Sequence, residues 1–278
     1  MLKSPMNYIG NKYRLLPQML EIFPTHIESF LDLFCGGLDV SVNVNANKKY
    51  ANDINHYLIG IYKAFQDNDY EEVMSYLLGK IREYGLSKTN REAYLLFRDY
   101  YNQCEARNPL DLYLLMNYGF NYQIRFNNDH DFNNPFGKDR SSFNVSLQMR
   151  LQLFMHEIQD IILTAKDFRE VRYKDVTFIY ADPAYTLSIG SYNDGKRGFN
   201  GWQLQDDLDL MAYLDDADRK GIQFALSDVL VHKGQSHSEM IKWAEKYNIH
   251  DMVCTYDNCN YQAKNSQYET REVLITNF

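Results

Sequence analysis

One stretch of the sequence constrains the fold more than any other: residues 176–193, which read VTFIYADPAYTLSIGSYN. Residues 178–180 form a short apolar run, and such a run is typical of a buried parallel strand. Pro183 has no amide hydrogen to donate, so the chain must leave the sheet there. Asp182 and Tyr185 therefore follow the carboxyl end of a strand, which is where open α/β sheets bind ligands. Taken alone, the pattern fits an ordinary strand-ending turn equally well.

A strand followed by a glycine turn lies near the start of the chain. Residues 30–34 (FLDLF) predict a buried strand, Gly36 and Gly37 predict a tight turn, and residues 38–44 predict the beginning of a helix. Glycines after such a strand let backbone amides approach a ligand closely. The full GxGxxG pattern of dinucleotide sites is absent, so a pyrophosphate-binding loop is not expected.

Residues 48–53 (KKYAND) predict a second short strand that ends at Asp53. An acid at this place can hydrogen-bond both ribose hydroxyls of an adenosine ligand. The competing interpretation makes Asn52 and Asp53 a cap for a helix over residues 55–65. The two roles are compatible with each other.

The remaining periodicities predict an alternation of helices and strands toward both ends of the chain. Helices are expected over residues 15–23, 70–84, 90–104, 109–116, 148–164, 204–220 and 238–247, and strands over 165–171, 223–229, 252–256 and 272–276. Alternation of this kind implies a largely parallel sheet, and hence the α/β class. The middle of the chain is mainly helical instead.

Residues 117–140 (NYGFNYQIRFNNDHDFNNPFGKDR) interrupt the helical pattern. The segment is rich in asparagine and aromatic residues, and residues 127–131 predict a hairpin turn. Arg125, Lys138 and Arg140 are available to phosphates or base edges. A loop of this length inside a compact domain is often functional.

Composition narrows the setting of the protein. The formal net charge of −8 argues against a protein that coats nucleic acid through bulk charge, although it leaves room for a local basic surface. Cys35, Cys104, Cys254 and Cys259 are scattered, so neither a metal site nor a disulfide framework is expected. No stretch approaches the roughly 20 apolar residues of a membrane span, and no signal peptide is evident at the start. A reducing cytoplasm is the expected location.

Seven motifs, taken together, resemble the Dam-type DNA adenine methyltransferases, and most closely their phage-encoded members. Each is weak alone, but all occur in the family's order and span nearly the whole chain. The motifs are NYIGNK (7–12), FLDLFCGGLDVSVNV (30–44), ANDIN (51–55), GFNYQIRFNNDHDFNNPFGK (119–138), DPAYTLSIGSYN (182–193), FALSDV (224–229) and REVLITNF (271–278).

The resemblance implies a Rossmann-like mixed, mostly parallel sheet with an inserted, mainly helical target-recognition domain that carries a β-hairpin. Residues 1–58 and 160–278 would form the catalytic domain, and residues 59–159 the recognition domain. The implied cofactor is S-adenosyl-L-methionine, and the implied substrate is an adenine in double-stranded DNA. No metal, membrane or obligatory protein partner is implied.

The resemblance also implies roles for individual residues. The implied catalytic residues are Asp182, Pro183 and Tyr185. Asp53 would hold the cofactor ribose, and Tyr192 would close over the site. The full set against the cofactor is Tyr8, Lys12, Phe34, Cys35, Gly36, Gly37, Leu38, Asp39, Asp53, Asp167, Phe168, Asp182 and Tyr192. The implied DNA contacts are Phe120, Asn121, Gln123, Arg125, Asn133, Pro135 and Lys138, with Phe120 as a wedge in the base stack and Arg125 as a guanine reader.

The chain departs from the family pattern at two positions. Ala184 stands where the family has a second proline, and its lack of a fixed φ loosens the turn. Gln123 stands where family members that read GATC have an apolar residue, so the expected target is GATC or a related short site. Two alternatives stay open: an adenine methyltransferase that acts on RNA, and a catalytically weak relative that only binds DNA. Whether a restriction enzyme accompanies the chain is also open.

Overall fold

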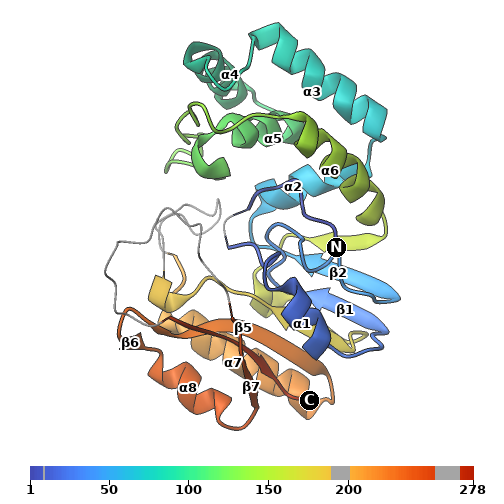
Figure 1. Cartoon of the computed structure of the whole chain (residues 1–278), viewed down its shortest axis with the longest axis vertical. Coiled ribbons are helices and arrows are strands. Elements are labelled where there is room, and N and C mark those ends of the chain that lie inside the picture. Colours follow the sequence, from blue (N-terminus) through green and yellow to red (C-terminus); the bar gives the residue numbers. More distant parts are fainter. Residues whose placement is uncertain (9, 189–200, 254–269) are drawn as a thin grey trace.

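The structure, a computed structural model of the chain, describes residues 1–8, 10–188, 201–253 and 270–278. Its centre is a mixed sheet in the order β3-β2-β1-β4-β5-β8-β7, with the short β6 paired to β5 (Figure 1). The strands are β1 (Ser29–Asp32), β2 (Lys48–Asn52), β3 (Ile161–Thr164), β4 (Phe178–Ala181), β5 (Gln223–His232), β6 (Gln235–Ser236), β7 (Asn248–Asp251) and β8 (Arg271–Thr276). The five strands from β3 to β5 are parallel, while β8 is antiparallel to its neighbours β5 and β7. The α/β class with a mostly parallel sheet is therefore confirmed.

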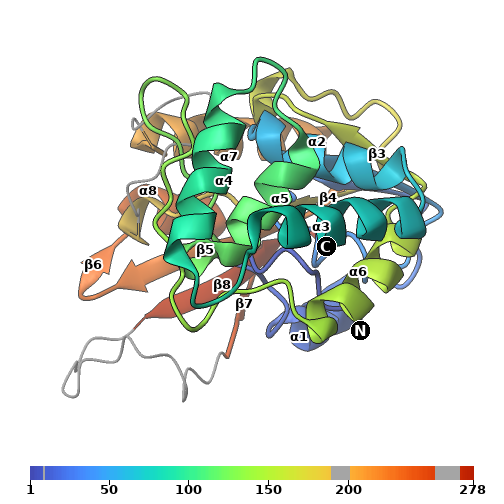
Figure 2. The same ribbon diagram turned by 90° about the horizontal axis from the view of Figure 1, so that it is seen from above.

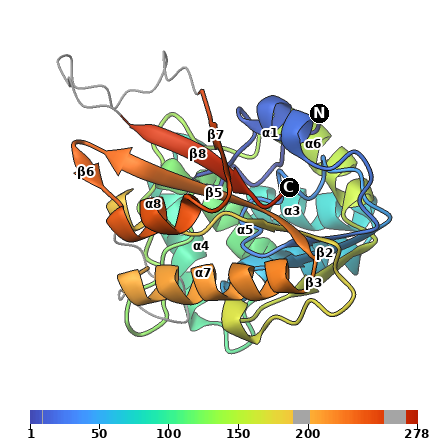
Figure 3. The same cartoon turned by 90° about the horizontal axis from the view of Figure 1, so that it is seen from below.

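Helices cover both faces of this sheet. The helices are α1 (Leu16–Ile22), α2 (His56–Gln66), α3 (Tyr70–Tyr84), α4 (Arg91–Gln103), α5 (Pro109–Tyr118), α6 (Val145–Glu157), α7 (Leu204–Arg219) and α8 (Ser238–Ala244). Figure 3 shows α1 on one side of the sheet and α7 and α8 on the other. Because successive strand residues point to opposite faces, Phe178 packs in the α1 cluster and Ile179 in the α7 cluster.

The middle of the chain forms a mainly helical part beside the sheet (Figures 1 and 2). Every residue of α5 from Leu110 to Tyr118 is buried, and α3 and α4 pack against this helix. Helix α2 contacts both α5 and β3, so it links the helical part to the sheet. The division at residues 59 and 159 stays a prediction. Among the residues that the structure describes, no helix has the length and apolar character needed to cross a membrane.

Two helix predictions are wrong, and one of them places β3 earlier in the chain than expected. Residues 38–44 form successive turns instead of a helix, because Leu38 has a positive φ of 62°. Helix α6 ends at Glu157, and β3 occupies residues 161–164. The segment 165–171, expected as a strand, instead contains the short 3-10 helix η2 (Phe168–Glu170). Ile161 and Ile162 are β-branched, and this apolar run pairs with β2 rather than extending a helix.

Two further expectations are corrected in detail. Strand β7 covers residues 248–251, just ahead of the expected 252–256, whose last three residues lie outside the described part of the chain. The hairpin turn is present, because the Asn127 amide donates to the Asp131 carbonyl at 2.9 Å. Its arms form isolated bridges, Gly119 to Phe136 and Phe126 to Phe132, instead of regular strands.

The strand order reverses between β1 and β4, so the carboxyl ends of these two strands border the crevice where such sheets bind ligands. A single buried amide, Asn52, braces this edge. Its Nδ2 donates to the carbonyls of Leu33, at 3.2 Å, and of Lys166, at 3.0 Å. Its Oδ1 accepts from the Thr164 hydroxyl at 2.8 Å and from the Lys166 amide at 3.1 Å. Asn52 therefore joins the ends of three parallel strands.

Asn52→Asp should lower the free energy of unfolding by roughly 2–4 kcal/mol, because it removes the Nδ2 donor from the buried Leu33 carbonyl and from the partly buried Lys166 carbonyl, and places a charge in a buried position. Urea denaturation measures the change. Asn45→Asp, at an exposed position, is the matched control, and it should change stability by less than about 0.5 kcal/mol. Equal changes for the two variants would show that the Asn52 network does not brace the sheet.

Candidate active site

The catalytic segment predicted from sequence follows β4 directly. The Asp182 carboxylate is 16% exposed and lies 2.9 Å from Lys12 Nζ. The Tyr185 hydroxyl donates a hydrogen bond to Asp182 Oδ1 at 2.9 Å. Burial raises the pKa of Asp182, and the Lys12 charge and the hydrogen bonds from Lys12 and Tyr185 oppose that rise. Three residues predicted for the site from separate motifs or positions therefore lie in direct contact.

Lys12 reaches the segment from the loop that precedes α1. Its Nζ also donates to the Gly10 carbonyl at 3.3 Å and lies 5.0 Å from the centre of the Tyr185 ring. A second carboxylate, Glu272 of β8, lies 3.8 Å from the same nitrogen. The sequence reasoning did not assign a role to Glu272. Its only signal was its place in the last of the seven motifs.

The glycine turn after β1 is tightly packed. Gly36 has a φ of 43°, which favours glycine. A Cβ at this position would lie 3.2 Å from Cδ1 of Tyr8, so the tyrosine ring fills the space beside the turn. The Tyr62 hydroxyl donates to the Gly36 carbonyl at 2.5 Å. Cys35 within this turn is buried, and burial raises the pKa of its thiol.

Asp53 holds the same turn from the end of β2. Its Oδ2 accepts from the Gly36 amide at 3.1 Å, and its Oδ1 accepts from the Asn55 amide at 2.8 Å. The cap of α2 is Asn55, whose side chain accepts from the amides of Tyr57 and Leu58. The observed cap, Asn55, therefore lies two residues after Asp53, so the expectation of a cap at Asn52 and Asp53 is corrected. The ribose role of Asp53 stays a prediction.

Asp32, the last residue of β1, is a candidate that the sequence reasoning missed. The residue is 1% exposed, and its Oδ2 accepts from the Ser41 hydroxyl at 2.6 Å. Its Oδ1 is buried without a hydrogen-bond partner. Burial raises the pKa of Asp32 to about 7, and the charges of Asp182 and Asp53 contribute. An acid inside the apolar run FLDLF was the signal, because buried acids are rare unless they have a function.

Asp39 also lies in this region, with an Oδ1 that accepts from the Ser4 amide at 3.0 Å. Burial raises its pKa to about 6. Leu38 and Asp39 are both buried beside the glycine turn. This loop therefore brings together the residues predicted to lie beneath the methionine end of a cofactor.

Three aromatic rings pack together on the other side of β1. The centroid of the Phe34 ring lies 5.4 Å from that of Phe168 and 5.5 Å from that of Trp202. Asp167 caps η2 by accepting from the Arg169 amide at 3.1 Å. Phe168, predicted with Asp167 to flank the cofactor adenine, thus lies next to Phe34. Trp202 was not anticipated, and only this contact reveals it.

The residues predicted to contact DNA all lie between α5 and α6. Phe120 is 46% exposed at the start of η1 (Phe120–Tyr122), and its amide donates to the Pro135 carbonyl at 2.7 Å. Asn121 has a φ of 51°. The Asn133 amide donates to the Arg125 carbonyl at 3.0 Å. Arg125 Nε and Asn133 Oδ1 are buried without hydrogen-bond partners, which is unusual for polar atoms that serve only the fold.

Gln123 follows η1 and is half-buried, whereas Lys138 is exposed. The turn between the two arms is held by Arg107, which donates to Asp131 Oδ1 at 2.7 Å and to the His130 carbonyl. Tyr192, predicted to close over the cofactor, lies outside the described residues. In the ranges that the structure covers, no group of three or more His, Cys, Asp or Glu side chains is arranged to hold a metal ion.

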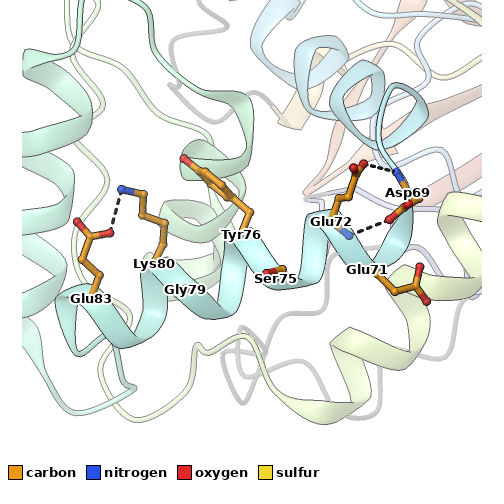
Figure 4. A pocket seen from close by; sticks show the side chains of 8 residues that line it. All are labelled: Asp69, Glu71, Glu72, Ser75, Tyr76, Gly79, Lys80 and Glu83. Atoms are coloured by element: carbon orange, nitrogen blue, oxygen red, sulfur yellow. Dashed lines mark hydrogen bonds and ion pairs between the residues drawn. The ribbon is translucent and has the colours of Figure 1, made fainter.

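Two surface hollows lie away from these residues. One follows the exposed side of α3, where Lys80 pairs with Glu83 at 3.1 Å and Asp69 with Glu72 forms a capping box (Figure 4). The other lies between α2, α3 and the start of α5. Neither contains a residue predicted for the active site. The excess of acids along α3 also disfavours a phosphate ligand in the first hollow.

Asp32→Asn should stabilise the protein, and by more at pH 8 than at pH 5. The carboxyl titrates near pH 7 in the folded protein and near 3.9 in the unfolded chain. The folded state therefore binds the extra proton between these values, so wild-type stability falls as the pH rises from about 4 to about 7. Asparagine has no proton to lose, and its oxygen still accepts from Ser41.

Thermal unfolding at several pH values measures the effect of Asp32→Asn. Asp216→Asn is the control, because the hydrogen bond from Lys220 lowers the pKa of Asp216, so that its contribution to stability is lost only below about pH 4. The effect of Asp216→Asn should therefore be the same at pH 5 and at pH 8. A difference in melting temperature between Asp32→Asn and wild type that does not change with pH would contradict the assignment.

Comparison with known proteins places this arrangement in a family. Residues 8–258 match the model of the D12 class N6 adenine-specific DNA methyltransferases. The chain is 42% identical over its whole length to the type II methyltransferase M.FokI of Planomicrobium okeanokoites, and 42% identical to the modification methylase StsI of Streptococcus sanguinis. It spans 43% of the length of each of these two relatives. The DNA adenine methylase of Escherichia coli strain K12 is 24% identical over 88% of the chain and 85% of its own length.

These relatives are bacterial proteins, so they lend no support to the narrower likeness to phage-encoded members. The family itself is shown by a match that covers nearly the whole chain, including the glycine turn and the segment after β4. Enzymes of this class use S-adenosyl-L-methionine as methyl donor. The chain belongs to the D12 class of N6 adenine-specific DNA methyltransferases.

Proposed function

We propose that this chain transfers a methyl group from S-adenosyl-L-methionine to the 6-amino nitrogen of an adenine flipped out of duplex DNA. The observation that carries the proposal is the position of Asp182 at the carboxyl end of a central strand, in contact with Lys12 and Tyr185. The family match names DNA as the substrate of the class, which favours DNA over RNA. The direct test is transfer of a tritiated methyl group to duplex DNA.

The residues around the glycine turn fit the cofactor. The unpartnered buried oxygen of Asp32 suits the ammonium group at the methionine end. Asp53 lies against the turn and suits the ribose hydroxyls, while Asp167 and Phe168 would flank the adenine ring of the cofactor. The bound cofactor supplies an electrophilic methyl group on a positively charged sulfur. Tyr8, packed on Gly36, would border the same site.

The catalytic segment suits activation of an aromatic amine. The 6-amino nitrogen is a poor nucleophile because its lone pair is delocalised into the purine ring. Asp182 would accept a hydrogen bond from one N–H of this amino group, and the Pro183 carbonyl would accept one from the other. These hydrogen bonds increase the electron density on the nitrogen. Tyr185 would stack on the base and hold it in line for attack. Such alignment can lower the barrier by roughly 7–11 kcal/mol.

The contacts of Asp182 indicate which of its oxygens the base would bond. Lys12 Nζ and the Tyr185 hydroxyl both point at this carboxylate. Both donors contact Oδ1, and a carboxylate carries lone pairs on two oxygens, so the amino group can bond Oδ2 while Lys12 and Tyr185 keep their places. Lys12 Nζ also lies 3.8 Å from Glu272. After transfer the nitrogen carries positive charge, and Asp182 stabilises that charge and can accept the departing proton.

Base flipping requires a wedge and a set of readers. Extrusion of a paired base costs a few kcal/mol, and the exposed Phe120 suits the vacated space in the stack. Arg125 and Asn133 have buried polar atoms without partners, and such atoms gain most from a ligand that pairs them. An arginine that bonds both acceptors of a guanine discriminates by about 1–3 kcal/mol. Lys138 would contact phosphate.

The target is a short site, GATC or a related sequence. Gln123 supports a related one, because it can hydrogen-bond a base edge where GATC-reading members present an apolar side chain. Sequencing of methylated bases in DNA from cells that express the chain identifies the site. The names of the two most similar relatives above suggest the biological role of modification within a restriction–modification system.

Asp182→Ala should abolish methyl transfer while S-adenosyl-L-methionine binding survives in part, since Asp182 acts mainly on the amino group. Single-turnover transfer to duplex DNA and calorimetry of cofactor binding measure the two effects. Asp160→Ala, at an exposed position, is the control and should retain the wild-type rate. If Asp182→Ala keeps more than about a tenth of the wild-type rate, a barrier change under roughly 1.4 kcal/mol, the assignment fails.

Ala184→Pro should keep or raise activity. Ala184 is exposed and does not have a positive φ, so the position is open to the second proline of the family pattern. A proline that suits the native backbone stabilises by about 0.4–1 kcal/mol. Melting temperature and single-turnover methylation are the measurements. A clear drop in both would show that this turn is built differently from that of its relatives.

A further inference from the structure

A cluster of buried polar side chains behind the catalytic segment plays no part in the chemistry above. Its centre is Asp207, in the first turn of α7, with a side chain that is 2% exposed. Its Oδ1 accepts from Trp202 Nε1 at 2.6 Å. Its Oδ2 accepts from the Thr186 hydroxyl and from His237 Nε2, which is 2.9 Å away. Asp207 is therefore a buried carboxylate that holds three side-chain donors.

The tautomer of His237 follows from its other contact. Its Nδ1 accepts from the Met240 amide at 3.2 Å, so this nitrogen is assigned as unprotonated. Nε2 then carries the proton and donates it to Asp207. His237 is 5% exposed, which leaves the pair little freedom to rearrange.

Thr186 makes this cluster relevant to catalysis, because it follows Tyr185 directly. Strand β4 fixes the first end of the catalytic segment, and Pro183 then takes the chain out of that strand. The short 3-10 helix η3 (Thr186–Ser188) at the other end lies beside β5. The hydrogen bond from Thr186 to Asp207 fixes the other end against α7. Displacement of a reacting group by 1 Å can cost about a hundredfold in rate. An anchor at this position therefore bears on the rate rather than on the fold alone.

The neighbouring Asp206 holds a different segment. Its Oδ1 accepts from Arg169 Nη2 at 2.5 Å. The same guanidinium donates from Nη1 to Asp167 Oδ1 at 3.0 Å and lies 4.5 Å from the centre of the Phe168 ring. Trp202, bonded to Asp207, packs against Phe168 with ring centroids 5.7 Å apart. Two adjacent acids on one helical turn thus reach two separate parts of the site.

We propose that the first turn of α7 positions both reacting partners. Asp207 holds the catalytic segment through Thr186, and Asp206 holds the cofactor-adenine segment through Arg169 and Asp167. This inference rests on the proposed function of the same site. Both acids are positioning residues, because each acts through another side chain and touches no reacting atom.

Kinetics and cofactor binding distinguish the role of Thr186 and Asp207 from that of Asp206 and Arg169. Thr186→Val removes the anchoring hydroxyl with little change in shape, and it should lower the saturated rate at least about tenfold with cofactor affinity within about twofold. Thr186→Ser keeps the hydroxyl and should restore most of the rate. Asp206→Asn should do the reverse, with the dissociation constant for S-adenosyl-L-methionine raised at least about threefold and a smaller loss of saturated rate.

Asp215→Asn is the matched control on the same helix. Asp215 also accepts from three side chains, Trp243, Lys246 and Tyr247, each at 2.8 Å. None of these belongs to the proposed site. The control should therefore lower the melting temperature and leave the saturated rate and the cofactor affinity unchanged.

Two outcomes overturn the positioning roles. Wild-type kinetics in Thr186→Val would show that Thr186 does not anchor the catalytic segment. Equal changes of rate and cofactor affinity in Thr186→Val and Asp206→Asn would show that the first turn of α7 has only a structural role. Failure of the proposed function looks different, because the wild type itself then yields no labelled DNA. In that case amide hydrogen exchange over residues 184–187 decides: faster exchange in Thr186→Val than in Asp215→Asn supports the anchor, and equal exchange overturns it.

Discussion

The ion pair between Lys12 and Asp182 is the contact on which the rest of the site depends. Acids gather at this edge of the sheet, and burial raises the pKa of both Asp32 and Asp228 to about 7. The charge of Asp182 contributes to both of these raised pKa values. Burial likewise raises the pKa of Asp182 itself. Lys12 opposes this with a positive charge at 2.9 Å. The Lys12 charge thereby lowers the pKa of Asp182 against the rise that burial causes, and so favours the ionised form of this acceptor.

The sequence predicted best those elements whose apolar runs are short and end in a turn. Strands β1, β2, β4 and β5 are of this kind, and glycine, acid or proline marks their ends. The prediction failed at residues 161–164. The apolar residues of the helix and of the strand follow each other without a break in the pattern, so the sequence does not show where the helix ends and the strand begins. Residues 38–44 failed for a local reason. Leu38 is left-handed, and the backbone bonds from Val42 to Leu38 and from Val44 to Val40 form separate turns that do not continue into a helix.

Within the site, motif residues were predictable and their supports were not. Asp182 and Lys12 belong to recognisable motifs, and the structure brings them together. Glu272 and Asp207 act through partners that are distant in the sequence, and Asp207 looks like any acid in the first turn of an amphipathic helix. Asp32 was within reach, since an acid inside a buried strand requires an explanation. Residues that are brought into contact only by the tertiary fold form no local motif in the sequence, so their contacts could not be predicted from it.

The contacts of Lys12 have a consequence for folding during synthesis. Lys12 precedes β1, whereas Glu272, its second carboxylate partner, belongs to β8. The residues that contact this one ammonium group are thus spread from the first loop to the last strand of the described chain. A nascent chain on the ribosome holds Lys12 long before it holds β8. The contacts of the Lys12 ammonium group are therefore complete only when β8 joins the sheet. A chain stalled before that point has most of the motifs but not the assembled site.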